Sequence, residues 1–147
     1  MDILSKLPER LNEVMFEKNL TPAEFAKQVG VDRNTITRYL QGVRLPSFKN
    51  FIKMLEVLNC SADFLVGLID FPPANLVFHP IPPFQERFKE LLQTFNFSQF
   101  KLYNKTKLSY DDYNRWLKGV SVPYVDSLVK LAQAFECSVD FILGRIR

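Results

Sequence analysis

VGVDRNTITRYLQGVR, residues 29–44, is the stretch of sequence that decides the fold. Gly30 permits the left-handed backbone conformation that a sharp break between two helices requires. Asp32 stands where an N-cap residue is expected, because its short carboxylate side chain accepts hydrogen bonds from free backbone N–H groups. Gly42 provides a stop at the other end. The stretch therefore predicts a tight turn followed by a short helix.

The two sides of this short helix differ in chemistry. Ile36 and Tyr39 lie three residues apart and form a narrow stripe for burial. The opposite side is polar or cationic, and Arg and Asn are the residue types that pair bidentately with guanine and adenine edges. A helix that enters a DNA groove has these properties. The outward residues are Arg33, Asn34, Thr37 and Arg38.

Helices are also predicted on both sides of this stretch. Apolar residues keep helical spacing before it, and Thr21-Pro22-Ala23-Glu24 has the pattern of a capping box at the start of a helix. No alternating strand pattern occurs, so residues 1–69 are expected to form one all-α domain of five helices. The other four predicted helices lie before Asn19, from Thr21 to Val29, from Pro46 to Asn59 and from Ser61 to Gly67.

Residues 70–83, DFPPANLVFHPIPP, carry five of the nine prolines in the chain and are expected to form a stiff linker. The linker also holds large apolar groups, which a solvated linker does not usually carry. We therefore expect Leu76–Phe78 to be extended, or a short strand, and docked on a neighbouring surface. Leu40 and Leu117 occupy corresponding rim positions, and together with the linker they could fix two domains or pair two chains.

The helical pattern restarts after the linker as an ungapped internal repeat with an offset of 77 residues. QGVRLP, ending at Pro46, matches KGVSVP, ending at Pro123, and NCSADFLVG matches ECSVDFILG. The sequence thus predicts an all-α protein in which one helical domain is used twice. Its expected parts are a first domain at 1–69, a proline-rich linker at 70–83 and a second domain at 84–147.

Both halves resemble the helix-turn-helix domains of the phage-repressor or Cro class, also called the XRE family. TPAEFAKQVGVDRNTITRYLQGVRLPS and FIKMLEVLNCSADFLVG carry the resemblance in the first half, and WLKGVSVPYVDSLVKLAQAFECSVDFILG carries it in the second. The resemblance implies two tandem, compact, five-helix domains of the lambda-repressor-like fold. In such domains the third helix enters the major groove, and the ends of the second helix touch phosphates.

The resemblance also implies roles for individual residues. Base-reading candidates are Arg33, Asn34, Thr37 and Arg38, and phosphate candidates are Thr21, Thr35, Arg44 and, in the second half, Gln99. The first half departs from the family at Pro22, where a glutamine often grips the DNA backbone.

The second half departs from the family more strongly. Tyr103 replaces the small Ala26, and Lys107 replaces Gly30 at the turn. Carboxylates at a helix N-terminus suit the helix dipole but suit a phosphate-rich groove poorly. The second domain is therefore either a weaker or altered DNA reader or a module for protein contact. Its recognition positions are Tyr110, Asp111, Asn114 and Arg115, with Asp112 beside them.

Composition and residue patterns narrow the classes of function that remain for this chain. The net charge of +3 permits nucleic-acid binding without requiring it. Cys60 and Cys137 have no metal-ligand spacing and are expected to be buried, reduced and equivalent, and His79 to be solvated or packed. No secretory signal or membrane-spanning run is evident, which favours a cytoplasmic location. Since no nucleophile–base pair, carboxylate dyad or phosphate-cradling loop occurs, neither an enzyme nor a cofactor is expected.

Two functions are compatible with these patterns. The leading hypothesis is sequence-specific binding of double-stranded DNA by a bacterial or phage transcriptional regulator, acting as a repressor. The alternative is a protein-interaction module, such as an antitoxin, an anti-repressor or a dimeriser, that keeps the helix-turn-helix fold. Double-stranded DNA is the expected partner, and a homodimer is left open.

Overall fold

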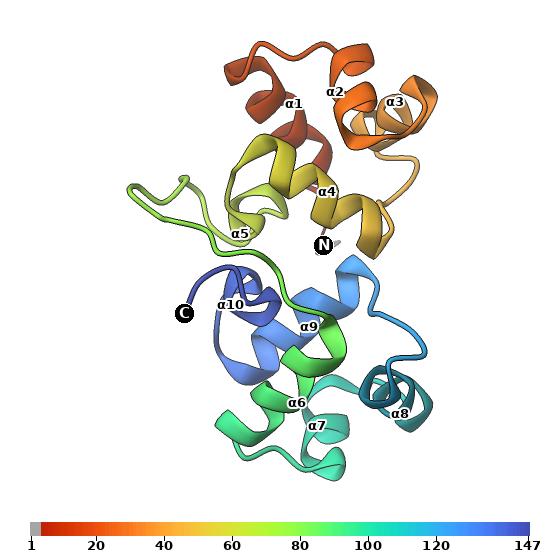
Figure 1. The fold of residues 1–147 in the computed structure, drawn as a ribbon, viewed down its shortest axis with the longest axis vertical. Coiled ribbons are helices and arrows are strands. Elements are labelled where there is room, and N and C mark those ends of the chain that lie inside the picture. Colours follow the sequence, from red (N-terminus) through yellow and green to blue (C-terminus); the bar gives the residue numbers. More distant parts are fainter. Residues whose placement is uncertain (1–3) are drawn as a thin grey trace. The chain divides into compact units, whose positions relative to one another are not determined.

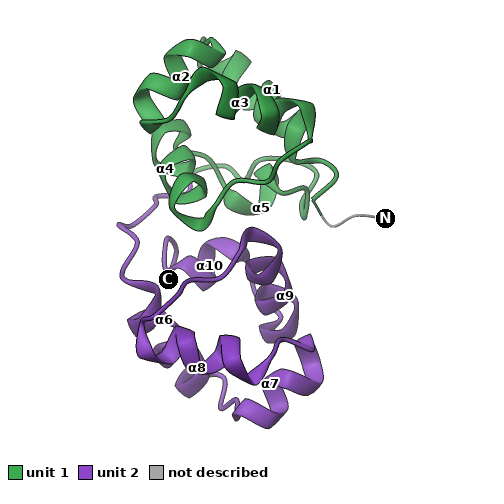
Figure 2. Cartoon of the chain, turned by 90° about the vertical axis from the view of Figure 1, so that its right-hand side faces the viewer, with its two compact units in different colours: residues 1–75 green, residues 76–147 purple. Residues whose placement is uncertain are grey.

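A computed structural model describes residues 4–147 of the chain, and residues 1–3 lie outside the description. The chain divides after Asn75 into two compact units, residues 1–75 and 76–147 (Figure 2). Every regular element within residues 4–147 is a helix, which confirms the predicted all-α class. No helix in this described part is long and apolar enough to cross a membrane.

The part of the first unit that the structure describes, residues 4–75, contains five helices, which are labelled in Figure 1. In this unit α3 packs against α1 and α2, α4 packs against α2, and α5 packs against α1. Phe25, Ile36 and Phe51 are fully buried where these helices meet. The helices are α1 (Leu7–Glu17), α2 (Pro22–Val29), α3 (Arg33–Gln41), α4 (Phe48–Leu58) and α5 (Ala62–Leu65).

The second unit repeats this arrangement. Every helix begins 77 residues after its counterpart, and only the last helix ends one residue later than the offset requires. Within this unit α6 packs against α8 and α10, and α9 packs against α7 and α10. The helices are α6 (Phe84–Thr94), α7 (Gln99–Thr106), α8 (Tyr110–Lys118), α9 (Val125–Phe135) and α10 (Val139–Leu143).

The helix boundaries follow the predicted capping residues with one exception. Thr21 forms the full capping box, since its hydroxyl accepts from the Glu24 N–H and the Glu24 carboxylate accepts from the Thr21 N–H. Gly30 and Gly42 both take the left-handed conformation, with φ of 88° and 74°. Asp32, however, makes no side-chain cap hydrogen bond, so its predicted capping role is wrong, although its backbone is extended as an N-cap requires.

This difference between Thr21 and Asp32 predicts different costs of mutation. Thr21→Ala should lower the free energy of unfolding of the first unit by about 1 kcal/mol, because a backbone N–H loses its cap. Asp32→Ala serves as the matched variant and should cost at most a few tenths of that value. Urea denaturation followed by circular dichroism gives both numbers. Equal losses for the two variants would contradict the observed capping pattern.

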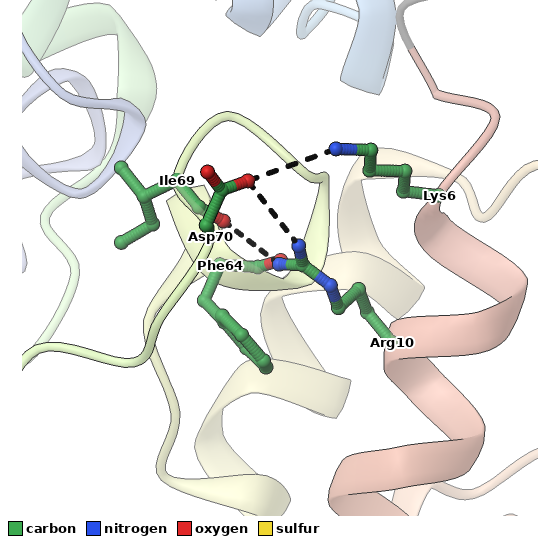
Figure 3. A network of polar contacts seen from close by, with 5 residues as sticks. All are labelled: Lys6, Arg10, Phe64, Ile69 and Asp70. Atoms are coloured by element: carbon green, nitrogen blue, oxygen red, sulfur yellow. Dashed lines mark hydrogen bonds and ion pairs between the residues drawn. The ribbon is translucent and has the colours of Figure 1, made fainter.

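Each unit joins its first helix to its last through one arginine. In the first unit Arg10 Nη1 donates to the carbonyl oxygens of Phe64 and Ile69, both at 2.8 Å, and its guanidinium lies 4.2 Å from the centre of the Phe64 ring. Lys6 and Arg10 also form long ion pairs with the exposed Asp70 at 3.8 and 4.0 Å (Figure 3).

The second unit has the same connection at the position 77 residues later. Arg87 donates to the carbonyl oxygen of Phe141, lies over the Phe141 ring and pairs with Glu90. Arg87 is only 5% exposed. This arginine therefore fixes α6 to α10 as Arg10 fixes α1 to α5.

The proline-rich segment is shared between the two units. Residues up to Asn75 belong to the first unit, and those from Leu76 onward belong to the second. Leu76–Phe78 form no strand. Leu76 and Val77 are exposed, so the prediction that this segment docks on a neighbouring surface is wrong for these two residues. Phe78 does dock, because the Arg145 guanidinium lies 3.9 Å from the centre of its ring. The next residue, His79, donates its backbone N–H to the Arg145 carbonyl at 2.7 Å.

The burial of the cysteines and of the rim leucines also differs from expectation. Cys60 and Cys137 are free thiols, but both are half-buried rather than buried. They directly follow the left-handed residues that end α4 and α9, where the chain turns outward. Leu40 and Leu117 are half-buried in their own units, so neither is a fully uncovered rim leucine.

Candidate nucleic-acid interface

The third helix of the first unit, α3, is anchored in the core through one of its faces. Ile36 is fully buried and Tyr39 is 2% exposed, so the predicted stripe anchors α3 in the core. The Tyr39 hydroxyl accepts a hydrogen bond from the Asn50 side chain of α4 at 3.0 Å. At the N-terminal side, the left-handed Gly30 closes α2 and lets the chain reverse into α3. The core thus fixes the position of α3, and the face opposite Ile36 and Tyr39 is left outside the core.

The base-reading candidates lie on this face of α3, opposite Ile36 and Tyr39. Arg33, Asn34 and Arg38 are exposed, while Thr37 is half-buried. Within residues 4–147 neither arginine forms an ion pair with a carboxylate, so both guanidinium groups remain available for a ligand. The Thr37 hydroxyl donates to the Arg33 carbonyl at 3.1 Å. The Thr37 hydroxyl is therefore left as an acceptor rather than a donor.

The phosphate candidates of the first unit come from three different segments. Thr21 is exposed at the start of α2, and Arg44 is exposed in the loop after α3. Thr35, in the first turn of α3, is half-buried. Because the Thr21 oxygen accepts the cap hydrogen bond, its O–H remains free to donate. The structure brings these residues into one unit with α3, while Gln99 belongs to the other unit and is half-buried.

The corresponding surface of the second unit has a different chemistry. Trp116 takes the place of Tyr39 in the core, with edge-to-face contacts to Phe84 and Phe88 at 5.9 and 5.5 Å. Tyr110 and Asp111 are exposed where Arg33 and Asn34 stand in the first unit. Asn114 and Arg115 are exposed as well, so the four predicted recognition positions share one face of α8.

Two local features of this surface differ from the first unit. Lys107 adopts the left-handed conformation with φ of 61°, as Gly30 does. Ser109 caps α8 by accepting from the Asp112 N–H at 3.1 Å, a bond that Asp32 does not make in α3. Tyr103 does not fill the tight helix crossing as the small Ala26 does, because it stays 37% exposed against Tyr110. Sequence reasoning missed Phe100, which is 67% exposed, although an apolar residue opposite the buried Leu102 was a readable signal.

Comparison with known proteins gives a match in the first unit. The sequence model of the helix-turn-helix family matches residues 9–65, which span most of α1 through α5. No solved structure matches the chain.

Two curated proteins are similar to part of the chain. An uncharacterized HTH-type transcriptional regulator of Haemophilus influenzae is 41% identical over 58 residues, which are 40% of this chain and 24% of that protein. The cryptic phage CTXphi transcriptional repressor RstR of Vibrio cholerae is 32% identical over 62 residues, which are 42% of this chain and 55% of that protein. The matches thus span about a quarter and about half of these relatives. The first unit contains a helix-turn-helix domain, and the chain is similar to proteins named as transcriptional regulators.

Proposed function

We propose that this chain is a sequence-specific double-stranded DNA-binding regulator of transcription, of bacterial or phage origin, that reads bases with α3 of the first unit. One observation carries the proposal: within the helix-turn-helix match, an anchored helix presents an asparagine and two arginines on its exposed face, and neither arginine forms an ion pair within residues 4–147. Arg33 and Arg38 would accept guanine as a bidentate partner, and Asn34 would accept adenine. Thr37 would contact a thymine methyl.

The phosphate contacts of this proposal surround α3. Thr21 would donate its free O–H at the start of α2, Thr35 would reach the backbone from the first turn of α3, and Arg44 would neutralise a phosphate beside the groove. Phosphate contacts set the register of a protein on the duplex, whereas base contacts provide specificity. The relative from Vibrio cholerae is named a repressor, which supports repression as the direction of control.

The second unit is a further copy of the same domain in this proposal. Support comes from the ungapped repeat and from helices that begin at the same offset of 77 residues. It does not read the same kind of site, because Tyr110 and Asp111 replace Arg33 and Asn34. Gln99 remains its phosphate candidate, and Asn114 and Arg115 its polar contacts. A second half-site would then be read by the first unit of another chain in a homodimer, about 34 Å along the duplex.

The salt dependence of binding to a selected DNA site tests the proposal. Duplexes that bind the full chain are selected from a random pool, and the dissociation constant is measured at several salt concentrations. The logarithm of affinity should fall linearly with the logarithm of salt, and Arg44→Ala should reduce the slope by about 0.9 while weakening all sequences alike. Lys18→Ala, just beyond the end of α1, is the control and should leave the slope unchanged. An affinity independent of salt would overturn the proposal.

A further inference from the structure

The outer side of α7 and the start of α8 carry aromatic and cationic groups that the first unit lacks. Phe100, Tyr103 and Tyr110 stand where the first unit has Ala23, Ala26 and Arg33. The three rings are 67%, 37% and 45% exposed, so they do not fill the core of their own unit. Lys101, Lys105 and Lys107 lie on the same helix and its following turn. These six residues are called the aromatic–lysine face below.

The rings and the lysines of the aromatic–lysine face are arranged together. Tyr103 and Tyr110 have ring centres 5.2 Å apart with their planes inclined at 40°. Phe100 precedes Tyr103 by three residues on α7, which makes the two neighbours on the helix surface. The Lys107 ammonium lies 5.3 Å from the centre of the Tyr103 ring, and the Lys101 ammonium lies 4.6 Å from that of Phe97. The face thus combines exposed rings with positive charge, and Lys107 lies directly against one of those rings.

The helix α7 carries positive charge without a carboxylate of its own. α7 contains no acidic residue, whereas its counterpart α2 contains Glu24. None of the three lysines pairs with a carboxylate in the described part of the chain, residues 4–147. The acidic residues next to this face in sequence are Asp111 and Asp112, which directly follow Tyr110 at the start of α8. An anionic ligand with planar groups is the complement of this arrangement.

We propose that the aromatic–lysine face binds single-stranded nucleic acid. Proteins that hold single strands without sequence preference combine cations along the phosphate backbone with exposed rings on which successive bases stack. A duplex fits less well, because its bases are already stacked on one another and offer no free faces to Phe100, Tyr103 and Tyr110. Exposed aromatic rings are enriched at protein interfaces as well, but lysine is depleted there, so the three lysines favour nucleic acid over a protein partner. The inference does not depend on how the first unit reads duplex DNA.

Fluorescence anisotropy with a labelled oligothymidylate tests this site in the full chain. Phe100→Ala should weaken binding about 5- to 150-fold, the loss expected for one stacked base. Tyr124→Ala is the matched control, because Tyr124 is 76% exposed and stands outside the face. Lys101→Gln together with Lys105→Gln should lower the salt slope by about 0.7 for each lysine. All four positions are exposed, so circular dichroism should report unchanged folding.

The inference would be overturned by no binding of the parent chain to the oligonucleotide at low salt, by equal losses for Phe100→Ala and Tyr124→Ala, or by an unchanged salt slope in the lysine variant. Capture of a protein partner through Phe100 without any oligonucleotide binding would also overturn it. A variant with Arg33→Ala, Asn34→Ala and Arg38→Ala should keep its affinity for the oligothymidylate. This last measurement separates the failure of the single-strand site from the failure of duplex reading by α3.

Discussion

Replacing Arg33, Asn34 and Arg38 together by alanine should abolish the preference of the chain for its selected duplex over random DNA. Each bidentate contact to a base is worth about 1–3 kcal/mol of discrimination, and the three side chains share one exposed face of α3. The anchor of the helix is untouched, because Ile36 and Tyr39 remain in the core. Competition binding against unrelated duplex measures the effect, and circular dichroism should show unchanged helix content.

The second unit supplies a matched control for this experiment. Tyr110→Ala, Asn114→Ala and Arg115→Ala alter exposed positions of α8, the helix equivalent to α3. These changes should leave the sequence preference intact if α3 alone reads the bases. The assignment of base reading to α3 fails if its triple variant binds the selected site as tightly as the parent. It also fails if the α8 variant loses the preference instead.

Arg145→Ala should destabilise the second unit by about 3–5 kcal/mol. Arg145 Nη1 donates to the Asp140 carboxylate at 2.7 Å, and the two residues are only 3% and 1% exposed. Removal of one partner of a buried pair leaves the other charge without its partner in a medium of low dielectric constant. The same change removes the guanidinium beneath the Phe78 ring. The expected loss is therefore far larger than for an exposed ion pair.

The single tryptophan makes this loss measurable in the full chain. Trp116 is buried in the second unit, so its fluorescence during urea denaturation follows that unit alone. Arg147→Ala changes an exposed arginine nearby in sequence and should leave the transition in place. Asp140→Leu combined with Arg145→Met should recover most of the stability, because neither charge is then buried. A single Arg145→Ala variant as stable as the parent would show that the pair contributes little.

Much of the helical architecture was predictable because its signals are local. Capping boxes, left-handed glycines and apolar spacing depend on a few neighbouring residues, and they located α2 and α3 closely. The ungapped repeat carried the same helix prediction to the second half. Lys107 departs from Gly30 at the turn by residue type, yet the structure shows it in the same left-handed conformation.

The wrong predictions for Asp32 and for Leu76–Phe78 depend on packing that the local sequence does not reveal. Asp32 has the right residue type and backbone for a cap, but whether its side chain turns toward the helix depends on packing around the turn. The partial docking of Leu76–Phe78 could not be predicted, because Phe78 finds its partner in Arg145, which lies near the other end of the chain sequence. The exposure of Phe100 has a local cause instead, because its place opposite Leu102 on α7 already indicated it. The roles of individual side chains toward DNA remain predictions.

The arginine that joins the first helix of each unit to its last has a consequence for how such a chain could have arisen. Arg10 brings the start of the first unit to the carbonyl groups of Phe64 and Ile69 near its end, and Arg87 does the same at Phe141. Each connection lies within a single unit, so each unit ties its own first and last helices together. Such a unit is suited to duplication, because every copy of the segment carries this connection with it.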